Sequence, residues 1–218
     1  GARQNLLNEN IPDNHIYVTG NTIIDALYSI INKARAVDFL EDTKDAMQFL
    51  NCGKNNLPRI ILVTGHRREN FGHGFEEICQ ALKDIAIENS DVQVIYPVHL
   101  NPNVREPVNR ILSGINNIHL IEPMGYLSFI KLMDLSYLVL TDSGGIQEEA
   151  PSLGKPVLVM RGRTERQEAV KAGTIKLVGT KKKDIVRAVS ELLTNNEKYA
   201  NMSKIHNPYG NGEASQNI

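Results

Sequence analysis

Three short segments of this 218-residue chain combine glycines with polar and charged side chains that are suited to binding an anion. They read Thr-Gly-His-Arg-Arg-Glu-Asn at 64–70, Thr-Asp-Ser-Gly-Gly-Ile-Gln-Glu-Glu at 141–149, and Arg-Gly-Arg-Thr-Glu-Arg at 161–166. Each segment follows a run of apolar residues that is typical of a buried strand. The chemistry of this protein is therefore expected in loops that follow strands.

The segment at 141–149 has the most specific pattern, because Ser143, Gly144 and Gly145 open a predicted helix directly after a strand. Glycines let an anion approach the backbone closely, and the unpaired amides of a first helical turn attract phosphate. Ser143 can donate its hydroxyl to the same anion, and Glu149 can accept hydrogen bonds from sugar or ribose hydroxyls. Alternatively, the glycines serve only a tight turn, with Asp142 or Ser143 as the helix N-cap.

The segment at 64–70 places a histidine beside two arginines. The guanidiniums of Arg67 and Arg68 can bind phosphate in a bidentate way. His66 can donate a proton or stabilise a departing oxyanion. The alternative is a solvated, charged turn. His99 also follows a predicted strand, but taken by itself it indicates a surface or packed histidine.

The apolar pattern alternates between predicted strands and helices, which indicates an α/β fold: a Rossmann-like parallel sheet with helices on both faces. In such sheets ligands bind beyond the carboxyl ends of the strands, where the three segments fall. Strands are predicted at 15–18, 59–64, 92–98, 118–121, 137–141, 156–160 and 175–178. Helices are predicted after a cap at Asn21 through Ile31, through Ala46 and Leu50, at 75–85, 104–112 and 126–135, from about Gly145, and at 185–193.

Composition excludes several classes of protein. Lys and Arg number 24 and Asp and Glu number 25, so the formal net charge is −1. A nucleic-acid-binding protein usually has an excess of basic residues, which this chain lacks. No apolar run approaches the length of a membrane span. Cys52 and Cys79 lack metal-type spacing, so we expect buried free thiols, a reducing cytoplasmic location and no metal site. We expect one domain over 1–218, with a polar tail on the surface after about residue 195.

Taken together, the loop segments resemble one family, the bacterial non-hydrolysing UDP-N-acetylglucosamine 2-epimerases. The resemblance implies a two-domain fold like the B class of glycosyltransferases, of which this chain is the C-terminal, UDP-binding half. It implies interconversion of UDP-GlcNAc and UDP-ManNAc by elimination and re-addition of UDP, for cell-envelope polysaccharides, without a cofactor and as a homodimer. The segments that carry it are Val18–Thr22, Thr64–Gly72, Tyr96–Val104, Thr141–Glu149, Gly154–Leu158 and Thr164–Arg166.

The resemblance also implies a role for each matching residue. His66 assists the leaving group as the catalytic residue, and the segment 123–129 lines the uracil pocket. A second, regulatory UDP-GlcNAc contacts Arg67 and His99. The remaining substrate-binding residues are Ser143, Gly144 and Gly145 at the diphosphate, Glu149 at the ribose, Arg166 at the UDP end of the substrate, and Met124 and Phe129 at the uracil. Arg68 is added to them because its guanidinium can bind phosphate.

Three alternatives remain. A hydrolysing epimerase is disfavoured by the Ser-Gly-Gly-Ile-Gln-Glu-Glu run, and a UDP-sugar glycosyltransferase by the segment 66–70. The third is a UDP-binding module without turnover. The chain begins at Gly1 rather than a methionine, so we expect part of a longer enzyme whose acid and base carboxylates lie in an N-terminal domain. By itself, this part is then expected to be inactive.

Overall fold

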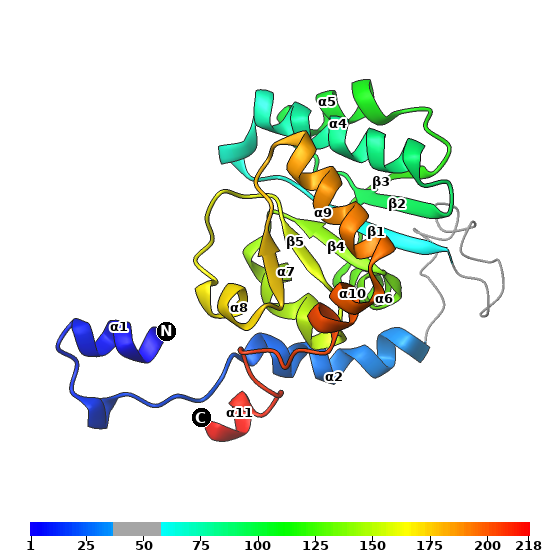
Figure 1. Ribbon diagram of the computed structural model, residues 1–218. Helices are drawn as coiled ribbons and strands as arrows, with labels where there is room; N and C mark the ends of the chain where they lie inside the picture. The colour runs from blue at the N-terminus through cyan, green and yellow to red at the C-terminus, as the bar shows by residue number, and fades with distance from the viewer. Residues whose placement is uncertain (37–57) are drawn as a thin grey trace.

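The computed structural model describes residues 1–36 and 58–218, which form a six-stranded parallel sheet with helices on both faces (Figure 1). The strand order is β3-β2-β1-β4-β5-β6, and every neighbouring pair is parallel. This confirms the predicted fold class. The strands are β1 (Arg59–Thr64), β2 (Val92–Pro97), β3 (Ile118–Ile121), β4 (Leu138–Thr141), β5 (Val157–Val159) and β6 (Ile175–Leu177).

Helices cover both faces of the sheet, so its strands are buried on both sides and read as continuous apolar runs. The α-helices are α1 (Ala2–Asn8), α2 (Thr22–Ala36), α4 (His73–Glu88), α5 (Pro102–Leu112), α6 (Tyr126–Leu135), α7 (Gly144–Glu149), α8 (Gln167–Ala172), α9 (Lys182–Thr194), α10 (Asn196–Ser203) and α11 (Ala214–Asn217). Short 3-10 helices are η1 (Asp13–His15), η3 (Arg68–Asn70) and η4 (Ala150–Leu153).

Two hydrophobic cores flank the sheet because alternate strand residues point to opposite faces. On one face, Ile61 and Val63 of β1 pack with α4, α5 and α9. On the other face, Ile60 and Leu62 pack with α2, α6, α7 and α8. Figure 1 shows these two layers of helices on either side of the strands.

The strand order reverses beside β1, the first strand of the sheet in sequence, which pairs with β2 on one side and β4 on the other. The register of β1 and β4 ends with Thr64 opposite Thr141, so the loops that follow both strands start side by side. A crevice at such a reversal is the usual ligand site of an open α/β sheet.

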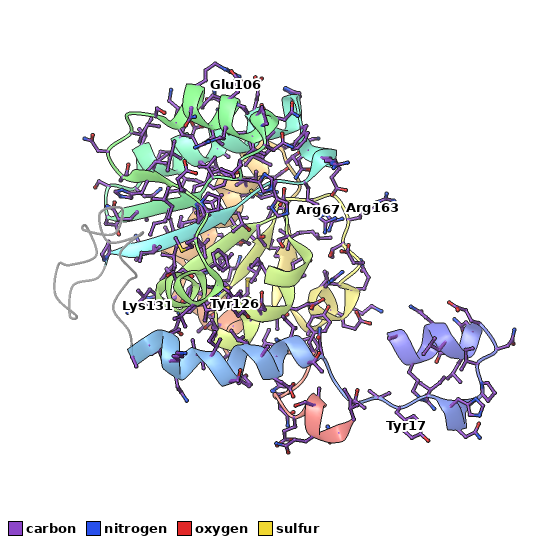
Figure 2. All side chains as sticks on the ribbon, turned by 180° about the vertical axis from the view of Figure 1, so that it is seen from behind. Tyr17, Arg67, Glu106, Tyr126, Lys131 and Arg163 are labelled. Atoms are coloured by element: carbon purple, nitrogen blue, oxygen red, sulfur yellow. The ribbon has the colours of Figure 1, made fainter. Side chains whose placement is uncertain are left out.

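The predicted strand at 15–18 is wrong. His15 ends η1, and the residues after it run as an extended segment that pairs with no strand in the described part of the chain. Figure 2 shows Tyr17 on an arm apart from the sheet, and 82% of Tyr17 and 76% of Val18 are exposed. The β-propensity of Ile16, Tyr17 and Val18 reflects packing against strand neighbours, which this arm lacks here.

The other differences lie in the tail and the connections. The polar tail after residue 195 lies on the surface as predicted, but it forms α10 and α11 and buries Asn207. The predicted helix through Ala46 and Leu50, and the thiol of Cys52, lie outside the described residues. Cys79 is a buried free cysteine. In the described ranges, no helix is long and apolar enough to cross a membrane.

Candidate functional site

Two of the three loops with anion-binding side chains, those at 64–70 and 141–149, meet at the carboxyl edge of the sheet. The hydroxyls of Thr64 and Thr141 lie 2.6 Å apart, and the amide of Asp142 donates to the carbonyl of Thr64 at 3.1 Å. Beyond this junction lies a hollow of about 230 Å³. It is lined by Thr64, Gly65, His66, Pro97, His99, Pro123, Met124, Phe129, Ser143 and Ile146.

The start of α7 presents Ser143 to this hollow. Ser143 occupies the N-cap position, but its side chain makes no capping hydrogen bond, and its amide donates to the hydroxyl of Thr141 at 2.9 Å. The alternative interpretation is thus met in part: Ser143 is the N-cap residue, but no side-chain hydrogen bond caps the helix. Ser143 lines the hollow without using its side chain as a cap.

Gly144 allows the third loop to approach the start of α7. A Cβ atom on Gly144 would lie 3.2 Å from Nη2 of Arg166, so a larger residue would press on the guanidinium. Arg166 bonds to Glu148 through Nε at 2.8 Å and lies 2.7 Å from Glu165 through Nη1. Arg166, predicted to reach the UDP end of the substrate, thus lies against the start of α7, whereas Arg163 of the same loop is exposed.

Glu149 is buried at the end of α7, and one carboxylate oxygen accepts a hydrogen bond from the hydroxyl of Tyr126 at 2.5 Å. Burial raises the pKa of Glu149, an effect that the hydrogen bond from Tyr126 opposes. The other oxygen lies 3.8 Å from the Cβ position of Gly145, so the carboxylate reaches back along α7. Tyr126 lies inside the segment predicted to line the uracil pocket, but no sequence pattern indicated its contact with Glu149.

His66 and His99 lie together although 33 positions separate them in the sequence. Their rings stack with centroids 5.4 Å apart and planes 20° apart. Both rings line the first hollow and also a second one of about 450 Å³, which Arg67 and Arg68 share with them. The structure thus groups Arg67 with His99 at the second hollow and places Arg68 there rather than at the first.

A network of polar side chains that the sequence did not point to joins the three loops. Asp142 accepts hydrogen bonds from the loop that carries His66. Arg161, also buried, bonds to Glu69 at 2.6 Å. Thr164 donates to Gln147 at 2.6 Å. Buried polar groups need such partners, so these contacts fix the relative positions of the loops.

In the described part of the chain, no group of three or more His, Cys, Asp or Glu residues is arranged to hold a metal ion. The side chains around the first hollow offer other chemistry: hydroxyl donors for phosphate, an apolar wall for a flat ring, and a histidine for proton transfer. The cationic donors lie beside it, at the second hollow and at Gly144.

The profile of the UDP-N-acetylglucosamine 2-epimerase family matches residues 1–218. The chain belongs to this family. A UDP-N-acetylglucosamine 2-epimerase of Salmonella typhimurium is 57% identical over all 218 residues, and one of Neisseria meningitidis is 46% identical over 217. Each alignment covers 100% of this chain and 57% of the relative, so the chain spans little more than half the length of these members of the family.

Solved structures of the family share this fold. The crystal structure of UDP-GlcNAc 2-epimerase from Neisseria meningitidis bound to UDP-GlcNAc superposes with a TM-score of 0.89 at 46% identity. The alignment covers 99% of this chain and 57% of that one. The Methanocaldococcus jannaschii UDP-GlcNAc 2-epimerase in complex with UDP-GlcNAc and UDP gives 0.78 at 32% identity, covering 99% and 56%. The predicted family is thereby confirmed.

Proposed function

We propose that this chain is the UDP-binding part of a UDP-N-acetylglucosamine 2-epimerase, an isomerase that interconverts UDP-GlcNAc and UDP-ManNAc without net hydrolysis. The observation that carries the proposal is one hollow at the strand-order reversal that brings together Ser143, His66, Met124 and Phe129. Two relatives of the same fold bind UDP-GlcNAc, which supports the choice of nucleotide sugar.

In the proposed complex, each wall of the hollow binds one part of the nucleotide. Met124 and Phe129 provide the apolar wall for the uracil. Ser143 and the glycine amides bind the diphosphate, and the carboxylate of Glu149 accepts hydrogen bonds from the ribose hydroxyls. Arg166 binds the diphosphate by exchanging its exposed partner Glu165 for phosphate oxygens while Glu148 keeps its position.

His66 is the proposed catalytic residue of this chain. Elimination removes the proton at C2 of the sugar and breaks the bond between C1 and the diphosphate oxygen. A protonated His66 gives its proton to that oxygen as UDP departs, and re-addition of UDP to the resulting glycal reverses the transfer. The base at C2 is assigned to the part of the enzyme that this chain does not contain, so the chain alone is proposed to bind without turnover.

The remaining parts of the proposal follow from the resemblance. The complete enzyme is proposed to be a cytoplasmic homodimer that needs no cofactor and supplies ManNAc units for cell-envelope polysaccharides. Arg67 and His99 are proposed to contact a second, regulatory UDP-GlcNAc in the second hollow. Arg68, which lines the same hollow, is proposed to contact the phosphates from that side.

The first test is a calorimetric titration of the 218-residue chain with UDP, with GDP and CMP as controls. Selective binding of UDP is expected. Ser143→Ala is expected to weaken it by roughly 0.5–1.5 kcal/mol, the net worth of one hydrogen bond. Ser29→Ala, on the exposed side of α2, is the matched control and leaves the affinity unchanged. Equal binding of all three nucleotides, or no effect of Ser143→Ala, would contradict the proposed pocket.

A further inference from the structure

Asp142 is a fully buried carboxylate whose hydrogen bonds all come from the loop that carries His66. The amide of His66 donates to both its oxygens, at 3.1 and 2.9 Å, and the amide of Arg67 donates to Oδ2 at 2.8 Å. The side-chain amide of Asn70 adds a bond to Oδ2 at 3.1 Å. In the described ranges, no lysine or arginine forms an ion pair with it. A buried charge needs such donors to offset lost hydration.

The same loop is also held from its other side. The hydroxyl of Tyr96 donates to the carbonyl of Gly65 at 2.9 Å, and Asn70 donates to the carbonyl of Met160 at 3.2 Å. The backbone of His66 is therefore fixed between two buried polar contacts. Asp142 directly precedes Ser143 in the sequence, so one short strand end sets the distance between His66 and the start of α7.

The carboxylate also faces the ring of His66. Nδ1 of His66 lies 3.7 Å from Oδ1 of Asp142, which is a charge contact and longer than a hydrogen bond, and 40% of the His66 side chain is exposed beside the two hollows that the ring lines. A carboxylate beside one ring nitrogen favours the tautomer that carries its proton on that nitrogen and leaves the other nitrogen for the reaction, as in other carboxylate–histidine pairs. Here Nδ1 is turned to Asp142, and Nε2 is left for the hollow.

We propose that Asp142 is the positioning residue of this site, which orients His66 so that Nε2 faces the departing UDP. This inference rests on the proposed function of His66. In the elimination step, the bond from C1 to the diphosphate oxygen breaks and the Nε2 proton moves to that oxygen. The neutral ring that remains carries its proton on Nδ1, toward Asp142, and re-addition returns the proton to Nε2.

The kinetic test uses a longer protein, in which this chain is joined to the part of the enzyme that its relatives have in addition. It compares Asp142→Asn, His66→Ala and the double variant. Asparagine keeps the size but replaces one accepting oxygen with an amide group. We expect kcat to fall about tenfold to a hundredfold, with KM changing far less. In the His66→Ala background, Asp142→Asn should cause no further loss of kcat. Independent, multiplying losses would overturn the proposal.

Asp134→Asn is the matched control, because Asp134 is also a carboxylate with little exposure but pairs with Arg35 near the end of α6. It should leave kcat at the wild-type level. A loss of kcat in Asp134→Asn equal to that in Asp142→Asn would mean that the effect is general destabilisation, and would overturn the positioning role.

A second measurement is independent of turnover, and its decisive part uses the unchanged chain. Long-range proton–nitrogen NMR spectra of the 218-residue chain report which nitrogen of His66 carries the proton in the neutral ring. The proposal expects the proton on Nδ1, and its loss or mixing in Asp142→Asn. A neutral ring protonated on Nε2 in the unchanged chain would overturn it. Absence of epimerisation by the longer protein of the kinetic test, together with an Nδ1-protonated His66, would instead refute the proposed function alone.

Discussion

At the scale of single residues, the site contains three acids with different partners, of which Asp142 and Glu149 are buried and Glu148 is partly exposed. Asp142 is surrounded by N–H donors, Glu148 by the guanidinium of Arg166, and Glu149 by the hydroxyl of Tyr126. These partners determine which acid can still accept a bond from a ligand. Of these three acids, Glu149 combines burial with a single neutral donor, and burial raises its pKa.

The pKa of Glu149 predicts how UDP binding depends on pH. Because burial raises this pKa above 4.5, the carboxyl takes up a proton at a higher pH than an exposed glutamate does. The protonated group accepts hydrogen bonds less well, so UDP affinity should fall as pH drops through the raised pKa. Calorimetric titrations over a pH series measure this, and Glu149→Gln should lower affinity and flatten that part of the profile.

The phosphate of UDP also titrates near pH ~6, so the comparison with a variant isolates the glutamate. Glu88→Gln, at the exposed end of α4, is the control and should keep the full pH dependence. The effect of pH on stability is opposite to its effect on UDP affinity. A carboxyl whose pKa is raised in the folded state stabilises the fold below its unfolded pKa of 4.5, and this stabilisation is lost as pH rises through the folded pKa. A profile for Glu149→Gln identical to that of the unchanged chain would exclude Glu149 from the binding site.

At the scale of elements, α10 packs on the domain through side-chain contacts that the local sequence pattern does not predict. The ring of Tyr199 in α10 stacks on Tyr137 with centroids 4.1 Å apart, and its hydroxyl donates to the carbonyl of Tyr137 at 3.0 Å. Glu191 of α9 pairs with Lys198 of α10 and with Lys176 of β6. This contact links three elements through one carboxylate.

Glu191 therefore predicts an acid-dependent part of the stability. Hydrogen bonds from Lys198 and then Lys176 lower its pKa from 4.5 to about 2. Since the folded pKa lies below the unfolded one, the stabilisation is present above pH 4.5 and is lost as pH falls toward 2. The pairs are partly exposed, so Glu191→Gln should cost about 0.2–1 kcal/mol per pair at neutral pH.

Urea unfolding of Glu191→Gln at several pH values checks this expectation. The variant should lose less stability than the unchanged chain when pH falls from above 4.5 toward 2. Glu197→Gln, exposed on α10, is the control and should behave like the unchanged chain. If Glu191→Gln loses as much stability on acidification as the unchanged chain does, the pairs contribute nothing measurable.

At the scale of the whole molecule, one sheet separates two cores, and β1 contributes to both. Leu62 is fully buried in the core with α2, α6, α7 and α8, between β2 and β4. Leu62→Ala should lower the free energy of unfolding by about 2–5 kcal/mol, because it removes buried methyl groups and leaves a cavity. Denaturant unfolding followed by circular dichroism measures the change.

Ile87→Ala provides the control, because 63% of Ile87 is exposed on α4. Its effect should stay within about 0.5 kcal/mol, as is usual for surface positions. A small effect of Leu62→Ala, comparable to that of Ile87→Ala, would mean that the centre of the sheet does not carry the stability of the domain.

Much of the fold was predictable from the sequence because strands and helices are indicated by the local spacing of apolar residues. Residues 59–64 form a continuous apolar run, as expected of a strand buried on both faces, and residues 75–85 follow helical spacing. The Ser-Gly-Gly segment after an apolar run identified a strand-to-helix junction. Parallel strands then brought the loops to one edge, which is why Ser143 and His66 were expected at the same site.

Local pattern failed where the outcome depends on neighbours that are distant in the sequence. Residues 15–18 have strand-forming side chains but no paired strand in the described part of the chain. The adjacency of β1 and β4 placed the carboxylate of Asp142 beneath the His66 loop and so gave it a role other than a helix cap. Which acid meets which donor was decided by packing of the whole sheet, because hydrogen bonds depend on distance and direction that sequence spacing does not encode.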